Sequence, residues 1–211
     1  MKALKWEGIY SALLTPFDSA DGIDFKLFEK NINIQKEAGI DGLVLGGSLG
    51  EASTLTYEEK KDLLICAKRL AGDKLPVILN IAEQSTREAI KFANNAEING
   101  ADGLMILPPM RYKADKIETL EYFKNIAANT SLPIMIYNNP HDYKIEVTLD
   151  MFEELEKIPT IQAIKESTRD VSNVTRLKNK FKNRFKILCG VDTLAFEELA
   201  LGADGWVGEV L

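Results

Sequence analysis

The sequence contains little of the chemistry that binds metals. It has one histidine and two cysteines among 211 residues. Cys66 and Cys189 lie far apart in apolar surroundings, without the short ligand spacing of a zinc site. The pattern therefore predicts two reduced thiols in the core and no metal site.

The sequence also lacks an excess of positive charge and any long hydrophobic run. Lys and Arg total 26 against 32 Asp and Glu, a formal net charge of −6 at pH 7, which offers no electrostatic attraction for nucleic acid. Residues 1–6 lack the apolar stretch of a secretory signal, and no run approaches the ~20 residues that span a bilayer. We therefore expect no nucleic-acid partner, no membrane partner and a cytoplasmic location.

What the sequence does contain is enough apolar side chain for one folded core. Hydrophobic residues make up 45% of the chain, which fits a single α/β domain over residues 1–211. β-rich apolar runs alternate with stretches whose apolar residues recur every three or four positions, the spacing of a helix. Such alternation predicts a parallel sheet. The predicted strands span residues 9–17, 42–49, 77–81, 103–107, 133–138, 161–166, 186–191 and 205–210.

A short repeat joins several of the predicted helices to the strands that follow. The pattern Gly-x-Asp-Gly occurs at residues 39–42, 100–103 and 202–205, and its first glycine suits the left-handed position that ends a helix. Recurrence of one joint favours a cyclic array. We therefore predict a (β/α)8 TIM barrel, with its chemistry at the C-terminal ends of the strands. Because the sequence stops at the eighth strand, the barrel is expected to lack its last helix.

Lys165 carries the strongest chemical signal. It lies near the end of the apolar run 161–166, where burial disfavours the ammonium form and can lower a lysine pKa by up to ~3–5 units. A neutral amine at that position can attack a carbonyl and form a Schiff base. The alternative is a lysine that extends from the strand end into solvent. Alternation along the strand sends Glu166 to the opposite face, where it need not keep the amine charged.

Tyr137 is the candidate acid–base group. It lies near the end of the apolar run 133–138, so the predicted strand delivers a phenol, which can carry a proton, into the turn that follows. The alternative is a tyrosine wedged in packing at the strand end, which is how most tyrosines are used.

Other polar residues at the presumed mouth of the barrel are ambiguous. Asn138, Asn139 and His141 are also explained as ordinary turn residues. Asp142 and Arg111 are an acid and a base in loops, where solvated charge is the usual explanation.

A glycine-rich loop at residues 46–51 follows the second predicted strand. Glycines let the backbone approach a ligand closely, so backbone amides and the Ser48 hydroxyl are candidates to hold a substrate carboxylate. A tight strand-to-helix turn explains the same glycines equally well. Thr56 followed by Glu59 fits a capping box at the start of the next helix.

Four motifs, taken together and in this order, resemble the dihydrodipicolinate synthase and N-acetylneuraminate lyase family over essentially the whole chain. The resemblance implies a (β/α)8 barrel in which Lys165 forms an imine with a 2-oxo acid and Tyr137 relays protons. It also implies that Ser48 and the amides of Leu49 and Gly50 hold the substrate carboxylate, and that no cofactor or metal is needed. The motifs are Gly47-Ser48-Leu49-Gly50-Glu51, Tyr137-Asn138-Asn139-Pro140, Ile164-Lys165-Glu166-Ser167 and Cys189-Gly190-Val191-Asp192.

Several positions depart from the dihydrodipicolinate synthases of that family. Those enzymes have paired hydroxyls in the glycine-rich loop, an arginine five residues beyond the tyrosine and a second tyrosine after strand four, and the matching residues here are Leu49, Asp142 and Met110. An acid cannot replace a cation that binds a second carboxylate. The pattern more closely resembles the branch that deaminates 1-pyrroline-4-hydroxy-2-carboxylate, and it implies substrate contacts from Met110, Asn139 and Asp142.

Alternatives remain open. Within the same chemistry they are 4-hydroxy-tetrahydrodipicolinate synthesis and aldol cleavage of a 2-keto-3-deoxy sugar acid. An alternative of another class is a shortened barrel that binds a metabolite or a subunit without turnover, because relatives add a final helix and a helical extension after strand eight. The expected partners are a small 2-oxo acid or pyrroline carboxylate and further copies of the chain in a homo-oligomer.

Overall fold

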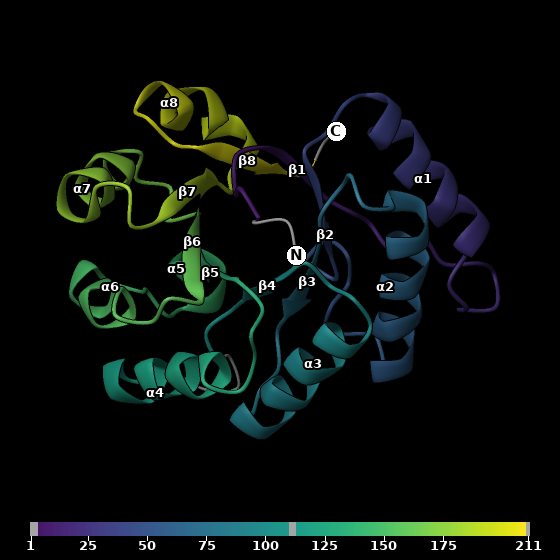
Figure 1. Ribbon diagram of the computed structural model, residues 1–211, viewed down its shortest axis with the longest axis horizontal. Coiled ribbons are helices and arrows are strands. Elements are labelled where there is room, and N and C mark those ends of the chain that lie inside the picture. The colour runs from purple at the N-terminus through teal and green to yellow at the C-terminus, as the bar shows by residue number, and fades with distance from the viewer. Residues whose placement is uncertain (1–3, 110–112, 210–211) are drawn as a thin grey trace.

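The computed structural model describes residues 4–109 and 113–209. Eight parallel strands close into a barrel in chain order, with β1 paired to β8 (Figure 1). The closed barrel confirms the fold predicted from the alternating pattern. The strands are β1 (Gly8–Ala12), β2 (Gly42–Leu45), β3 (Val77–Ile81), β4 (Gly103–Ile106), β5 (Ile134–Asn138), β6 (Ile161–Glu166), β7 (Lys186–Cys189) and β8 (Gly205–Gly208).

The helices surround the strand ring, as Figure 1 shows. Two of them, α5 and α6, lie between β5 and β6, and the short α5 begins directly after β5. Within the described part of the chain, no helix is long and apolar enough to cross a membrane. The helices are α1 (Phe25–Glu37), α2 (Tyr57–Ala71), α3 (Thr86–Ile98), α4 (Lys116–Ala127), α5 (Pro140–Tyr143), α6 (Leu149–Leu155), α7 (Ser172–Phe181) and α8 (Ala195–Ala200), with a 3-10 turn, η1 (Asp192–Leu194), before α8.

The strands separate two apolar cores. In β2, for example, Leu43 and Leu45 belong to the larger cluster between sheet and helices, whereas Val44 belongs to the smaller cluster inside the barrel. This alternation follows from the two-residue period of a strand. Each fully buried large side chain contributes roughly 1.5–3 kcal/mol. The inner cluster consists of Trp6, Tyr10, Ala12, Val44, Ile78, Met105, Leu107, Met135, Tyr137, Ala163, Leu188 and Val207.

The first glycine and the aspartate of the Gly-x-Asp-Gly repeat each have a structural role. Gly39, Gly100 and Gly202 have φ values of 86°, 82° and 100°, the left-handed conformation predicted for a helix end. The aspartate of each copy then accepts a hydrogen bond from a backbone amide of the preceding strand. These bonds join Ile9 N to Asp41 Oδ2, Val77 N to Asp102 Oδ2 and Ile187 N to Asp204 Oδ2, each at 2.8 Å.

Several predicted strands were too long at their C-terminal ends. The predicted strand 42–49 ends at Leu45, because Gly46 turns to a φ of 59°. The predicted strand 9–17 ends at Ala12, with one further ladder bond from Leu13 N to Val44 O at 3.0 Å. The predictions 186–191 and 205–210 end at Cys189 and Gly208, and residue 210 lies outside the described residues. Apolar side chains continue past several of these points, so hydrophobicity alone does not mark where a strand ends.

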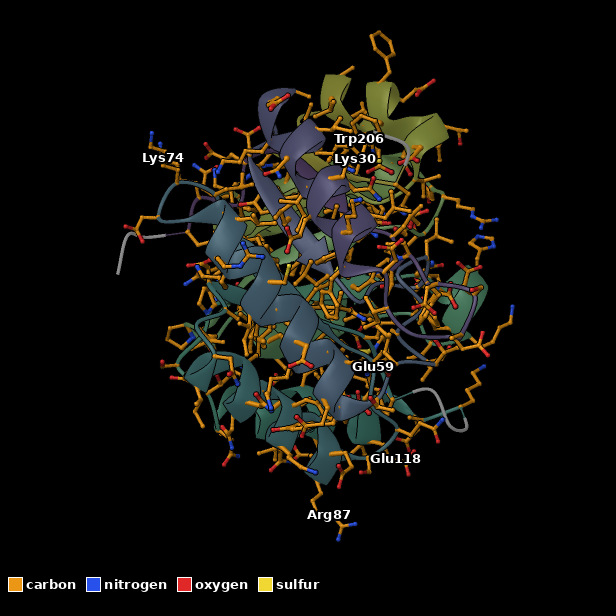
Figure 2. All side chains as sticks on the ribbon, turned by 90° about the vertical axis from the view of Figure 1, so that its right-hand side faces the viewer. Lys30, Glu59, Lys74, Arg87, Glu118 and Trp206 are labelled. Atoms are coloured by element: carbon orange, nitrogen blue, oxygen red, sulfur yellow. The ribbon has the colours of Figure 1, made fainter. Side chains whose placement is uncertain are left out.

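The helix N-termini lie at the same end of the barrel as the strand C-termini. Thr56 and Glu59 form the predicted capping box at the start of α2, and Asp115 and Glu118 form another at the start of α4. Glu59 and Glu118 are both labelled in the lower part of Figure 2. Satisfied caps at this end leave the intervening loops free to carry side chains for chemistry.

Glu198 of α8 is a buried carboxyl group. Its side chain is 0% exposed, and among the described residues neither of its oxygens has a hydrogen-bond partner. Burial raises the pKa of Glu198 from 4.5 to about 7. The folded state therefore favours the neutral acid, and ionisation opposes folding.

Glu198→Gln is expected to stabilise the chain at neutral and alkaline pH but not at acidic pH. Because the folded pKa lies above the unfolded one, wild type loses stability as the pH rises from 4.5 through about 7, a loss of up to about 3 kcal/mol. The uncharged variant avoids that loss at pH 8 and matches wild type at pH 4. Urea unfolding at the two pH values measures the difference, with the exposed neighbour Glu197→Gln as control. Equal gains at both pH values would contradict the assignment.

Candidate active site

Lys165 and Tyr137 lie side by side at the C-terminal end of the barrel. The register pairs Tyr137 of β5 with Lys165 of β6. Tyr137 belongs to the cluster inside the barrel, and Lys165 follows the inward-facing Ala163 by two residues. Both side chains therefore enter the same space at the top of the inner core.

The Lys165 amine is held inside the barrel, not extended into solvent. Its side chain is 2% exposed, and Nζ lies 4.2 Å from the centre of the Tyr137 ring and 3.9 Å from Glu209 Oε1. Burial lowers the pKa of Lys165 from 10.5 to about 8, against the opposing effect of Glu209 and Asp192. A substantial fraction of the amine is therefore neutral near pH 8 and able to act as a nucleophile.

Glu166 faces away from this site, as the alternation predicted. Its carboxylate accepts hydrogen bonds from the Thr168 amide at 2.7 Å and from Asn173 Nδ2, in α7, at 2.8 Å. Through Asn173, Glu166 links β6 to α7 on the outer face of the sheet.

Gly190 makes room for the lysine. A Cβ at this position would lie 2.6 Å from Lys165 Cε and 2.1 Å from Ser167 Oγ, so any other residue would displace the lysine stem. Ser167 Oγ itself is buried and has no hydrogen-bond partner among the described residues. The glycine of the Cys189-Gly190 pair is thus explained by the space that Lys165 occupies.

Tyr137 is also buried, at 3% exposure. Its hydroxyl accepts a hydrogen bond from Asn139 Nδ2 at 3.2 Å, and the same amide donates to Asp142 Oδ2 at 2.7 Å. Burial raises the pKa of Tyr137, and the Asn139 bond partly offsets this rise. At neutral pH the residue is a phenol with a proton to give.

Asn139 and Asp142 are held by the start of α5. The Asp142 amide donates to Asn139 Oδ1 at 3.2 Å, which makes Asn139 the N-cap of the helix. Asp142 also lies 3.8 Å from Arg169 Nη2. Asn139 therefore lies between the Tyr137 hydroxyl and the Asp142 carboxylate. Asn138 is structural, because its side chain donates to the backbone oxygen of Val147 and accepts from its amide.

Tyr143 contacts two of the candidate residues, and the sequence analysis did not identify it. Its hydroxyl forms a hydrogen bond with Ser48 Oγ, and its ring meets that of Tyr137 edge to face, with centroids 5.7 Å apart. Burial raises the pKa of Tyr143 to about 12. The signal was its place six residues after Tyr137, but only the short α5 turns it back toward the barrel axis.

The glycine-rich loop is anchored from β3 and from the segment that follows β1. Asn80 Nδ2 donates to Gly46 O at 2.7 Å, and Thr15 Oγ1 donates to Gly50 O at 2.8 Å. A Cβ at Gly50 would lie 2.7 Å from the Leu13 carbonyl oxygen, so this close approach requires glycine.

The same loop has backbone donors without a hydrogen-bond partner in the described part of the chain. The amide of Glu51 donates to Ser48 O at 3.2 Å, closing a tight turn, whereas the amides of Leu49 and Gly50 donate no hydrogen bond within the described residues. The turn interpretation and the anion-holding interpretation are therefore compatible. Met110 and Arg111, also expected at the mouth, lie outside the described residues.

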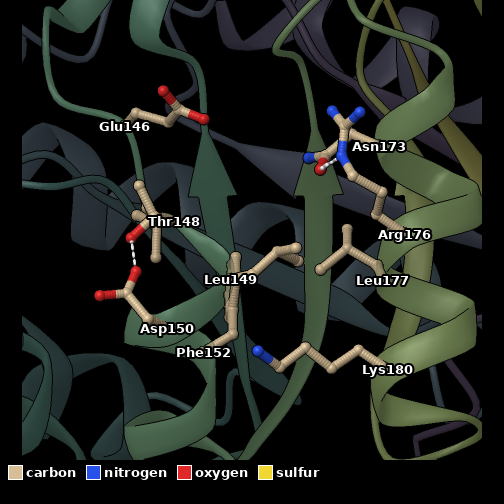
Figure 3. A pocket seen from close by; sticks show the side chains of 10 residues that line it. Glu146, Thr148, Leu149, Asp150, Phe152, Asn173, Arg176, Leu177 and Lys180 are labelled. Carbon is tan, nitrogen blue, oxygen red and sulfur yellow. Dashed lines mark hydrogen bonds between the residues drawn. The ribbon is translucent and has the colours of Figure 1, made fainter.

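A separate cavity of about 380 Å³ lies outside the barrel, between α6 and α7 (Figure 3). It is lined by Asp150, Arg176 and Lys180 among others and includes neither Lys165 nor Tyr137. Within the described part of the chain, no group of three or more His, Cys, Asp or Glu side chains is arranged to hold a metal ion. The side chains that the described part of the chain brings to the barrel mouth carry an amine, phenols, a hydroxyl, an amide and carboxylates.

Comparison with known proteins gives one consistent result. The sequence profile described as "Dihydrodipicolinate synthetase family" matches residues 5–210. The 4-hydroxy-tetrahydrodipicolinate synthase of Exiguobacterium sibiricum is 36% identical over 200 residues, which cover 95% of this chain and 68% of the relative.

Solved structures agree. The 4-hydroxy-tetrahydrodipicolinate synthase of Methylacidiphilum fumariolicum SolV superimposes with a TM-score of 0.93 at 34% identity, covering 96% of this chain and 68% of that one. The chloride-inhibited dihydrodipicolinate synthase of Acinetobacter baumannii, complexed with pyruvate, has a TM-score of 0.94 at 32% identity and covers 97% and 70%.

Proposed function

The chain belongs to the dihydrodipicolinate synthetase family, whose members are lyases, and on that premise we propose that Lys165 forms a Schiff base with a small 2-oxo acid. The observation that carries this proposal is the buried Nζ, 4.2 Å from the Tyr137 ring, with a pKa lowered to about 8. A buried amine with this pKa is suited to attack a ketone near neutral pH.

The neighbouring groups suit the remaining steps. Once the imine forms, it withdraws electrons from the adjacent carbon, whose proton then becomes acidic enough for Tyr137 to carry. The amides of Leu49 and Gly50, which donate no hydrogen bond within the described residues, and the Ser48 hydroxyl are the donors we propose for the carboxylate of the 2-oxo acid. Tyr143 connects Ser48 to the Tyr137 ring.

The first specific candidate is condensation of pyruvate with aspartate semialdehyde. It is supported by the relatives, which carry the name 4-hydroxy-tetrahydrodipicolinate synthase. One solved relative also holds pyruvate. The names favour this reaction over the deamination that the motif pattern favoured.

The second candidate is deamination of 1-pyrroline-4-hydroxy-2-carboxylate, supported by Asp142. This carboxylate lies one amide group away from the Tyr137 hydroxyl, where synthases are expected to place a cation. An acid there repels the carboxylate of aspartate semialdehyde, whereas it attracts a ring hydroxyl or a protonated ring nitrogen. Aldol cleavage of a 2-keto-3-deoxy sugar acid and a non-catalytic barrel are the remaining alternatives.

Reductive trapping separates these possibilities. The purified chain is incubated with pyruvate, the hydroxypyrroline carboxylate or a 2-keto-3-deoxy sugar acid, reduced with borohydride, and mapped by mass spectrometry. We expect an adduct of pyruvate on Lys165. Loss of aspartate semialdehyde together with pyruvate then indicates the synthase, and ammonia release from the pyrroline indicates the deaminase.

The same experiment tests the proposal as a whole. Absence of any adduct on Lys165 with all three compounds would overturn the Schiff-base function and favour the binding barrel. Adducts spread over exposed lysines such as Lys74 would show non-specific chemistry and count against it equally. Assembly into a homo-oligomer stays a prediction that sedimentation of the same sample tests.

A further inference from the structure

Glu209 follows β8 and points into the active site by strand alternation. Val207 of β8 belongs to the inner cluster, so the residue two positions later faces the same interior. The pairing of β8 with both β7 and β1 closes the barrel and brings Glu209 near Lys165 of β6. No motif in the sequence analysis included it.

The backbone at Glu209 is anchored. Its amide donates to both carboxylate oxygens of Asp192, at 3.3 and 3.4 Å. Asp192 also accepts a hydrogen bond from Trp206 Nε1 at 2.9 Å. The Glu209 side chain is 27% exposed and its Oε1 lies 3.9 Å from Lys165 Nζ.

Among the described residues, Glu209 is electrostatically coupled to Lys165, Asp192, Asp142, Tyr137 and Tyr143. Burial raises the pKa of Glu209, Lys165 opposes this rise, and Asp192 and Asp142 add to it. Glu209 in turn raises the pKa of Tyr137 and of Tyr143, although in both tyrosines burial is the larger cause. A carboxyl group with a raised pKa beside an amine with a lowered one is suited to exchange protons near neutral pH.

The Glu209 carboxylate, 3.9 Å from Lys165 Nζ, works against the nucleophile if it acts only on the free amine. It raises the pKa of Lys165 and so reduces the neutral fraction that attacks. The same carboxylate helps once the imine forms. The iminium nitrogen is cationic, so a nearby negative charge stabilises this intermediate. A negative charge 3.9 Å from Nζ therefore favours the iminium and the path to it.

We propose that Glu209 is a further catalytic residue, which accepts the proton released by Lys165 Nζ as the C–N bond forms. This inference rests on the Schiff-base function proposed above. As Nζ attacks the ketone, the C=O π pair moves to oxygen and the nitrogen becomes cationic. Glu209 takes a proton from that nitrogen and returns it to the oxygen. A second proton from solvent converts the hydroxyl to water, the C–O bond breaks, and the nitrogen lone pair forms the C=N bond.

The variant Glu209→Gln tests this role, because glutamine keeps the size of the side chain but removes its charge and its ability to accept the proton. Imine formation with pyruvate is followed by rapid quenching into borohydride and intact-mass measurement between pH 6 and 10. We expect the plateau rate to fall at least ~10-fold. We also expect the midpoint of the pH profile to move downward, because the carboxylate that raises the pKa of Lys165 is gone. Glu197→Gln makes the same charge change on the exposed face of α8 and is expected to match wild type.

A second variant distinguishes proton transfer by Glu209 from a purely structural role. Glu209→Asp keeps the negative charge but, being one methylene shorter, holds it farther from Nζ. Its rate of imine formation is therefore expected to lie between those of wild type and Glu209→Gln. The midpoint of its pH profile is expected to lie above that of Glu209→Gln. Wild-type rates and midpoints in the Gln variant, or equal loss in Asp and Gln with no change of midpoint, would overturn the role. Failure of wild type itself to form an adduct on Lys165 would instead count against the Schiff-base function.

Discussion

Lys165→Met is expected to abolish catalysis while making the chain more stable at neutral pH. Methionine keeps most of the buried volume but has no nucleophilic nitrogen, so adduct formation with pyruvate disappears and turnover falls by at least about 10⁴-fold. Any turnover that remains must come from groups that bind and polarise the substrate without a covalent bond. Mass mapping after borohydride reduction and a steady-state assay measure the two losses.

The gain in stability follows from the lysine pKa. In the folded chain burial lowers that pKa from 10.5 to about 8, so below pH 8 the folded state must bury an ammonium that the unfolded state solvates. The resulting cost is up to about 3 kcal/mol, and it disappears as the pH rises from about 8 through 10.5. The variant is therefore expected to be about 1–3 kcal/mol more stable than wild type at pH 7 and no more stable above pH 10.5.

The exposed Lys74→Met is the matched control, because it removes a solvated lysine (labelled in Figure 2). It is expected to change neither activity nor stability. A Lys165→Met variant that unfolds more easily at pH 7, or that still turns over, would show that the amine is a structural cation and not a nucleophile held at a cost.

The sequence was sufficient for the barrel because each strand is an apolar run and each joint has a local cause. Gly39 and Asp41 illustrate this, since one ends a helix and the other binds the preceding strand. The sequence was less informative about where strands end. At Gly46, for instance, a positive φ ends the strand while the apolar residues continue.

The candidate site likewise contains residues that the sequence predicts and residues that it does not. The sequence was sufficient to select Lys165 and Tyr137 as candidates, because a charged and a phenolic side chain interrupt apolar runs. Glu209 and Tyr143 were not, because their positions depend on long-range geometry. Glu209 faces Lys165 only once β8 closes against β1, and Tyr143 reaches Ser48 only because α5 folds back over the mouth. Sequence pattern records local preference, whereas these contacts come from closure of the whole barrel.

Tyr137→Phe is expected to separate imine formation from the later proton transfers. The variant keeps the ring whose centre lies 4.2 Å from Nζ, so the lysine stays buried and adducts with pyruvate still form. It lacks the hydroxyl that Asn139 binds at 3.2 Å and that carries the proton. Turnover is therefore expected to fall by about 10²- to 10⁴-fold.

Tyr122→Phe is the matched control for losing a buried hydroxyl. The Tyr122 side chain is 3% exposed and its hydroxyl donates to the Glu83 carbonyl oxygen at 3.0 Å, away from Lys165. Its loss is expected to reduce stability by about 1 kcal/mol and to leave turnover unchanged. Burial raises the pKa of Tyr137 above its ordinary value of 10.0, so wild type should keep its phenol, and its rate, up to at least pH 10. Equal turnover in the two phenylalanine variants would mean that Ser48 and Tyr143 carry the proton without Tyr137, and it would move the acid–base role to the glycine-rich loop.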